Sequence, residues 1–486
     1  MGESFPSSSC GVTRRGFLVG AATGLAAGGA LTWLGLRNME SAAGHATGSV
    51  ALPGRPAAAP STLAMPGPYP GRVIEVRHPG AVSADHRINQ DAVNAMIDRG
   101  MKELTGADHP RDAWRRFFCA DDVVGIKVNP VGRKPLPGEG RVPGAVGVIS
   151  SPEVVLKVVR ELKEAGVKPR NIILFERYAD EFERTGYEAL TRERGMEGVR
   201  WYASAAAYTN TQLDIHGFDL GRDHYSFELC RHVVGYDPDV FVHMGFAAPD
   251  HSEKDDRRFR SHLSLIVTKM VNKIITIPCL KDHRSAGVTL ALKNLSHGMN
   301  NNVARSHIAR IVRRDGGVSG PNQCNTFIPT AASQHPLREK ATLHILDGLI
   351  GVYEGGPGSW NATWGTWHHK GLLFATDPVA LDHIGWEIID AQRARMGWPS
   401  VAQMGLLQDT PEVKFTRAAA ALGSPQPVGT VALAAAAKNI QESRGSESFD
   451  VRQPQHVILA GDRHGLGFFN RENIVYRPIT IRVPSR

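Results

Sequence analysis

Val123-Val124-Gly125-Ile126-Lys127-Val128 is an apolar run with the length of a buried strand, and a lysine stands near its end. A helical pattern follows at 154–165, where Ser151-Pro152-Glu153 supplies a capping serine, a first-turn proline and an acid, and Gly166 ends it. Residues 171–175 form the next strand-like run. A strand, a helix and a strand in this order predict two parallel strands of one sheet.

The same alternation continues along the chain in both directions. Further strands are predicted at 73–76, 241–244, 274–278, 343–346 and 372–375, and further helices at 89–104, 262–271 and 377–389. The fold class is therefore predicted to be α/β, with a mainly parallel sheet and helices on both faces.

The first residues have the pattern of an export signal. Arg14-Arg15 is a twin-arginine pair, and the weakly apolar segment 17–36 carries no charge before Arg37. We expect residues 1–46 to be a twin-arginine signal peptide cleaved after Ala43 or Ala46, which predicts a periplasmic or extracellular protein. An uncleaved signal would leave a membrane-anchored form.

The composition of the residues after the predicted signal indicates a linker followed by a folded domain. Residues 47–71 are rich in Pro, Ala and Gly, which is typical of a linker. An α/β domain is expected over 72–486, with an Ala-rich insertion near 399–450. The signal, the linker and this domain make up the predicted organisation.

Bulk properties restrict the function classes. Charged residues make up 21% of the 486 residues, and the formal net charge of +8 is scattered rather than gathered in a stripe. Nucleic acid is therefore not expected as a partner. The positive net charge is compatible with a small anionic ligand or with an ordinary solvated surface.

The cysteines lack close-spaced pairs. Cys119, Cys230, Cys279 and Cys324 are far apart, so neither an iron–sulfur cluster nor a structural zinc site is expected. One or two disulfides and buried thiols are both compatible with this spacing.

Polar residues follow most of the predicted strands. In open α/β sheets, ligands bind beyond the carboxyl ends of the strands. The residues at these ends are Lys127, Asn129, Glu176, Arg177, His243, Lys281, Asp282, His283, Asp347 and Asp377.

The stretch 281–307 has the highest density of such groups. Lys281 and Lys293 could hold a phosphate or a carboxylate. His283, His297 and His307 could bind a divalent metal, although their spacings of fourteen and ten residues match no standard metal motif. A metal site, an anion site and a structural role all remain open here.

Several motifs carry a family resemblance. They are Val124-Gly125-Ile126-Lys127-Val128-Asn129, Pro278-Cys279-Leu280-Lys281-Asp282-His283, the run 287–295, Leu346-Asp347-Gly348, Gly355-Gly356-Pro357-Gly358 and Asp377-Pro378-Val379-Ala380-Leu381-Asp382. In these motifs the chain resembles the domain of unknown function 362. The resemblance implies that Lys281, His283, Lys293 and Asn294 match the family's Lys-x-His and Lys-Asn pattern. Some members carry a ferredoxin-like module, whose cysteine motifs this chain lacks.

Two functional hypotheses follow. The first is an enzyme that acts on a small anionic substrate, with or without a metal; its catalytic residues would be Lys281, His283, His243 and Lys293, and its ligand-binding residues Lys127, Asn129, Asn294 and Asp382. The alternative is a non-catalytic periplasmic protein that binds a metal, a carboxylate or a phosphate. The expected partners are the small ligand and the export machinery, and contact with the membrane is expected only through the signal segment.

Overall fold

The computed structural model describes residues 63–131, 148–209, 212–247, 255–283, 285–307, 311–313, 318–319, 324–356, 365–406 and 454–482. The chain divides into the units Met1–Val50 and Ala51–Arg486, and every described residue belongs to the second. The predicted signal, most of the predicted linker and most of the predicted insertion lie outside the described residues. Within the described part, no helix has the length and apolar character that crossing a membrane requires.

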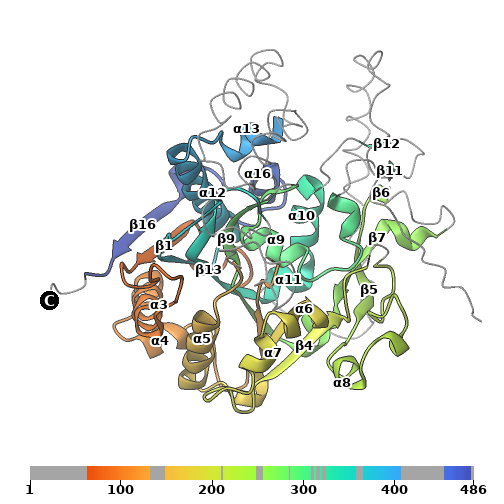
Figure 1. Cartoon of the computed structure of the whole chain (residues 1–486), viewed down its shortest axis with the longest axis horizontal. Helices are drawn as coiled ribbons and strands as arrows, with labels where there is room; N and C mark the ends of the chain where they lie inside the picture. The colour runs from red at the N-terminus through yellow and green to blue at the C-terminus, as the bar shows by residue number, and fades with distance from the viewer. Residues whose placement is uncertain are drawn as a thin grey trace, which may run out of the picture. The chain divides into compact units, whose positions relative to one another are not determined.

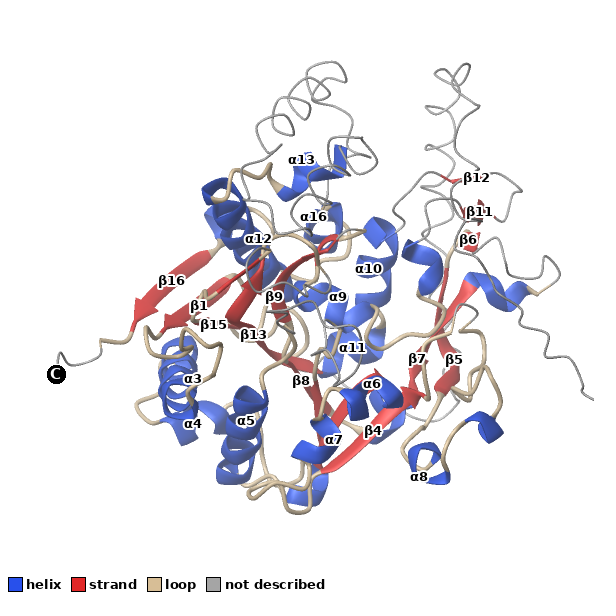
Figure 2. Cartoon of the chain, viewed as in Figure 1, coloured by secondary structure: helices blue, strands red, loops and turns tan. Residues whose placement is uncertain are grey.

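One large mixed sheet organises the described residues (Figure 2). Along the sheet the strands are β16 (Val475–Thr480), β1 (Arg72–Arg77), β15 (Gly371–Ala375), β13 (Ala341–Val352), β8 (Lys273–Thr276), β2 (Val124–Lys127), β3 (Ile172–Tyr178) and β4 (Arg200–Ala205). The strands β9 (Cys279–His283), β10 (Gly287–Val288) and β14 (Thr366–Trp367) extend this sheet. Along the main order, neighbours are parallel except that β15 runs antiparallel to both β1 and β13. Of the added strands, β9 is parallel to β13, whereas β10 is antiparallel to β9 and β14 to β13. The predicted mainly parallel α/β fold is confirmed.

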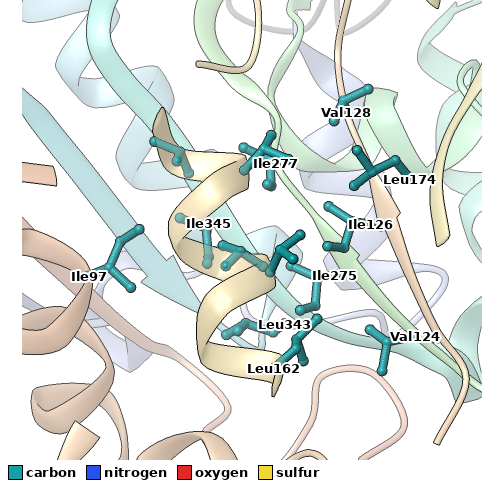
Figure 3. Close-up of a cluster of buried hydrophobic side chains, with 14 of the residues drawn as sticks. Ile97, Val124, Ile126, Val128, Leu162, Leu174, Ile275, Ile277, Leu343 and Ile345 are labelled. Atoms are coloured by element: carbon teal, nitrogen blue, oxygen red, sulfur yellow. The ribbon is translucent and has the colours of Figure 1, made fainter. Parts of the chain in front are cut away.

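Helices cover both faces of the sheet (Figure 1). On one face, α3 (Gln90–Thr105), α4 (Pro110–Arg115) and α5 (Pro152–Ala165) pack on strand residues such as Ile126 and Ile275. Figure 3 shows this cluster, with Leu162 among the strand side chains. On the other face lie α9 (Leu290–Ser296), α10 (Cys324–Ala332), α12 (Pro378–Arg395) and α16 (Gln455–Asp462). Because successive strand residues point to opposite faces, Leu174 joins the first cluster and Ile173 the second.

The remaining described helices are short. They are α6 (Ala179–Arg184), α7 (Tyr187–Leu190), α8 (Phe227–Cys230), α11 (His335–Lys340) and α13 (Val401–Leu406).

The helix ends explain why α5 stops and α12 begins where the sequence predicted; α12 itself continues to Arg395, beyond the predicted end at 389. Gly166 ends α5 in the left-handed region, at φ 108°, a conformation that glycine adopts without steric cost. Asp377 begins α12 by accepting hydrogen bonds from the backbone N–H groups of Val379 and Ala380. The expected side-chain cap from Ser151 is wrong: its side chain makes no capping hydrogen bond, and its own N–H donates to Asp347 at 2.7 Å.

One other local prediction is wrong. The segment 262–271 is not one α-helix but β7 (Arg260–Ser264) followed by a π-helical turn, Ile266–Met270. The strand predicted at 241–244 is β5 (Tyr236–His243), which pairs with β7 in a separate two-stranded sheet. A third small sheet contains β6 (Phe246–Ala247), β11 (Ile311–Arg313) and β12 (Val318–Ser319).

Candidate anion-binding site

Lys127 lies at the carboxyl edge of the sheet, where β2 and β3 run side by side. The parallel register aligns Lys127 with Phe175, so the next residue of β3, Glu176, reaches the Lys127 ammonium and forms a buried ion pair with it. Nζ also donates to Val128 O at 2.7 Å and to Asn294 Oδ1 at 2.8 Å. An ammonium has three hydrogens, so this group has used all of its donors.

Lys281, on β9, is fully buried and equally well satisfied. Its Nζ donates to the carbonyl oxygens of Val131 and Val148 and, at 3.5 Å, to Asn129 Oδ1. Burial lowers the pKa of Lys281 from its ordinary value, because desolvation disfavours the charged form. Its three partners are oxygen acceptors without formal charge.

Helix α9 carries Lys293 and Asn294, and a carboxylate from another helix holds its start. Asp382 of α12 accepts hydrogen bonds from Ala291 N at 2.7 Å and Leu292 N at 2.9 Å, which are N–H groups in the first turn of α9. Both Asp382 oxygens serve this purpose, and the side chain is fully buried. Asp382 was predicted to bind the ligand; the structure shows it positioning the helix that bears Lys293.

Lys293 differs from the other two lysines. Its side chain is only partly buried, and among the described residues its Nζ has no hydrogen-bond partner. Desolvation lowers the pKa of Lys293 to about 8; the nearby Cys324 opposes this shift, while Arg177, Lys281 and Lys127 contribute to it.

Other polar atoms beside Lys293 also lack partners. Arg177 donates from Nη1 to His297 O, but its buried Nε has no acceptor in the described part of the chain. Asn294 Nδ2 and both ring nitrogens of His456 are likewise buried and unsatisfied there. Burial, with a smaller effect of the Lys293 charge, lowers the pKa of His456 to about 3, so its imidazole is neutral. Buried polar groups of this kind normally have a partner, and a bound molecule could supply it.

We call Lys127, Lys281, Lys293 and Arg177 the cationic cluster. The carboxylates whose charges act on its members most directly are Glu176, Glu181 and Asp282. Only Lys127 forms an ion pair within the described residues. The four cations therefore outnumber these three carboxylates, and the excess lies at Lys293 and Arg177, whose donors are not all used.

The family model of the domain of unknown function 362 (DUF362) matches residues 250–387. Over these residues the chain is therefore similar to DUF362. This confirms the resemblance expected from the motifs over that stretch. Lys281, Lys293, Asn294 and Asp382 lie inside the matched stretch, whereas Lys127 and Arg177 precede it and His456 follows it. Segments on both sides of the matched stretch thus contribute to the cluster and its surroundings.

Other comparisons add little beyond the family. A crystal structure of a protein from Thermotoga maritima, a structural genomics target, is 11% identical, with a TM-score of 0.27. The similarity covers 56% of this chain and 53% of that chain, so this chain spans about half the length of that protein. No curated protein matches the sequence.

Within the described residues, no group of three or more His, Cys, Asp or Glu side chains is placed to hold a metal, so the predicted histidine site is not assembled there. His283 Nδ1 accepts the backbone N–H groups of Ser285 and Ala286 at 3.0 and 3.1 Å, which leaves the proton of a neutral ring on Nε2. His297 Nε2 lies 2.7 Å from Ser306 Oγ, and the hydroxyl in turn donates to Val303 O. The His307 side chain lies outside the described residues.

His243 is placed apart from the main sheet. It ends β5, pairs across the strand with Arg260, and its ring centre lies 6.0 Å from that of Phe259.

The other predicted site residues, except Asp382 and the histidines, surround or belong to the cationic cluster. Sequence reasoning did not select Arg177 or Cys324 as site residues, although it noted that Arg177 follows a strand and counted Cys324 among the cysteines. It did not consider His456 as a site residue. No sequence signal marks His456, which joins the site through the packing of α16 on α10.

Proposed function

We propose that this protein binds a small anionic molecule at the cationic cluster and acts on it as an enzyme. The observation that carries the proposal is the unsatisfied charge and hydrogen-bonding capacity at Lys293 and Arg177. A carboxylate or a phosphate would satisfy both groups, since charged donors make strong hydrogen bonds to such oxygens. Asn294 Nδ2 would supply a further donor.

The activity half of the proposal depends on Lys293. An ammonium with a pKa of about 8 exchanges its proton near neutral pH, which suits a general acid or base, whereas an ordinary lysine stays charged. A protein that only binds an anion has no need of such a group. A non-catalytic binding protein is the alternative, and recovery of the ligand unchanged after long incubation would favour it.

The experiment compares the wild-type protein with Lys293→Met, which removes the charge but keeps most of the chain length. Inorganic phosphate and oxalate are titrated by calorimetry. We expect binding to weaken at least tenfold in the variant, since a hydrogen bond to a charged group contributes about 1.5–3 kcal/mol. Lys168→Met, at an exposed lysine, is the matched control and should bind as the wild type does. Equal binding by Lys293→Met, or no binding by any form, would overturn the proposal.

We further propose that the protein reaches the periplasm by twin-arginine export. Arg14-Arg15 and the weakly apolar segment 17–36 support this proposal. Replacing both arginines by lysine should leave the full-length precursor in the cytoplasmic fraction. An unchanged distribution between fractions would contradict it.

A metal bound by His283, His297 and His307 stays a prediction. The metal content of the untagged protein and of His283→Ala tests it: stoichiometric metal lost in the variant would support metal-assisted chemistry. Equal metal content in the two proteins would contradict a metal site at His283. The lysines alone would then neutralise the charge of the substrate.

A further inference from the structure

The three lysines of the cationic cluster differ in what surrounds their nitrogens. Lys127 and Lys281 each donate to three oxygen acceptors, whereas Lys293 has none among the described residues and keeps some exposure to solvent. From this geometry we propose that Lys293 is a nucleophile that forms an imine with the carbonyl group of a small oxo acid. This inference rests on the proposed anion site and names its substrate class.

The surroundings of Lys293 favour its neutral amine. Within the described part of the chain no oxygen accepts a hydrogen bond from its ammonium. Desolvation penalises the charged form and cations act on it, and a lysine next to other cations in a desolvated site is a known way to activate an amine. A pKa of about 8 instead of 10.5 raises the unprotonated fraction at pH 7 by roughly two orders of magnitude. The groups whose charges act on Lys293 are Cys324 from α10, Arg177 from β3, Lys281 from β9 and Lys127 from β2, and the Lys293 charge in turn acts on His456 from α16.

The thiol and the imidazole near Lys293 do not compete as nucleophiles. Burial raises the pKa of Cys324 to about 11, so the group stays a thiol at neutral pH, and its Sγ donates to Ser306 O at 3.3 Å. His456 is neutral and fully buried. Lys293, whose side chain is only partly buried, is thus the candidate reactive nitrogen of this cluster.

The chemical step is balanced without a redox partner. The Lys293 nitrogen lone pair forms a bond to the carbonyl carbon, and the carbonyl oxygen takes up the electron pair. Proton transfer from nitrogen to oxygen gives a carbinolamine. The nitrogen electron pair then forms the C=N bond as the C–O bond breaks, and the second nitrogen proton leaves with the hydroxide as water, which gives the imine. The acid's carboxylate would meet Arg177 Nε and Asn294 Nδ2, the donors that lack protein acceptors in the described residues.

The test uses glyoxylate, the smallest oxo acid, together with cyanoborohydride, which reduces an imine to a stable secondary amine. Peptide mass spectrometry on the intact, full-length protein then reports the rate of carboxymethylation at each lysine. We expect Lys293 to be modified at least tenfold faster than Lys168 at pH 7, and phosphate to slow the reaction at Lys293 alone. Lys293→Arg keeps a cation but cannot form the imine, so this fast modification should disappear. Lys168→Arg should retain it.

The outcomes separate the two proposals. If phosphate binding requires Lys293 but glyoxylate modifies Lys293 no faster than Lys168, the imine proposal is wrong and the anion site stands. If fast modification occurs without any effect of phosphate, the amine is reactive but the anion site is wrong. A second readout is acetylation of Lys293 by acetic anhydride from pH 6 to 10. A midpoint near pH 8 supports the proposal, and a midpoint above pH 10 contradicts it.

Discussion

Gly298 offers a direct test of how the cationic cluster is built. A Cβ atom at this position would lie 2.5 Å from Lys127 Cε and 2.6 Å from Lys127 Nζ. It would also lie 2.5 Å from the backbone oxygen of Asn294, which cannot move as easily as a side chain. Gly298→Ala should therefore push the Lys127 ammonium away from Glu176 and distort the end of α9.

The magnitude follows from two terms. Adding a methyl group to a packed interior costs about 1–3 kcal/mol. Separating a buried ion pair so that one charge loses its partner costs about 3–5 kcal/mol. Because Lys127 can shift without losing Glu176 completely, we expect a loss of about 2–5 kcal/mol in the free energy of unfolding.

Urea unfolding followed by circular dichroism measures this loss. Gly245→Ala is the matched control, since a Cβ there meets nothing within 4 Å and the backbone is not in the left-handed region. Its stability should change by no more than about 0.5 kcal/mol. The double variant Lys127→Ala/Gly298→Ala should lose less than the sum of its single changes, because the shortened side chain no longer clashes. Strict additivity, or a Gly298→Ala effect as small as that of the control, would refute this account of the packing.

Three further predictions concern other buried charges. Burial alone would raise the pKa of Glu75, but hydrogen bonds from His369 and Arg77 outweigh it and hold the pKa at about 2, below its ordinary 4.5. The lowered pKa contributes about 3 kcal/mol to the free energy of unfolding; this contribution is present above pH 4.5 and is lost as the pH falls towards 2. The stability of Glu75→Gln should therefore fall less steeply with decreasing pH than that of the wild type. The same pH dependence in both proteins would contradict this. Asp382→Ala leaves two buried N–H groups without acceptors, so its free energy of unfolding in urea should fall by about 2–5 kcal/mol. Its phosphate affinity should fall as well, and calorimetry that shows normal affinity would refute the positioning role of Asp382. Lys281→Met should cost about 2–4 kcal/mol of stability but weaken phosphate binding less than threefold, and a loss as large as that in Lys293→Met would show that Lys281 also holds the ligand.

The regular elements were predictable because their signals are local. The apolar run at 123–128 and the proline and glycine that bound α5 depend on neighbouring residues alone, and the structure has β2 and α5 there. The segment 262–271 was misread because its apolar residues also suit a strand followed by one turn. Pairing with β5, which periodicity does not encode, selects the strand.

The candidate site was predictable only in part, and for a physical reason. The position of polar residues after strands predicted that Lys127 and Lys281 would meet at one sheet edge, since parallel strands end there together. It could not predict that Asp382 reaches α9, because a cap supplied by a distant helix leaves no spacing pattern. His456 is more remote still, since α16 follows the predicted insertion and joins the site through helix packing.

The roles of the three lysines illustrate what decides function in such a site. The sequence predicted Lys281 and Lys293 as an anion clamp and Lys127 as a ligand-binding residue. The structure separates the lysines by the acceptors around each nitrogen, and half of those acceptors are backbone carbonyls, which any residue could provide. A lysine whose three hydrogens all donate to protein oxygens stabilises the fold and has little left for a substrate. When a lysine lies among cations and has no hydrogen-bond acceptor, its charged form is destabilised. Binding an anion or losing the proton relieves that destabilisation. Among the described residues Lys293 is in that second position, and for this reason we propose the chemistry at Lys293.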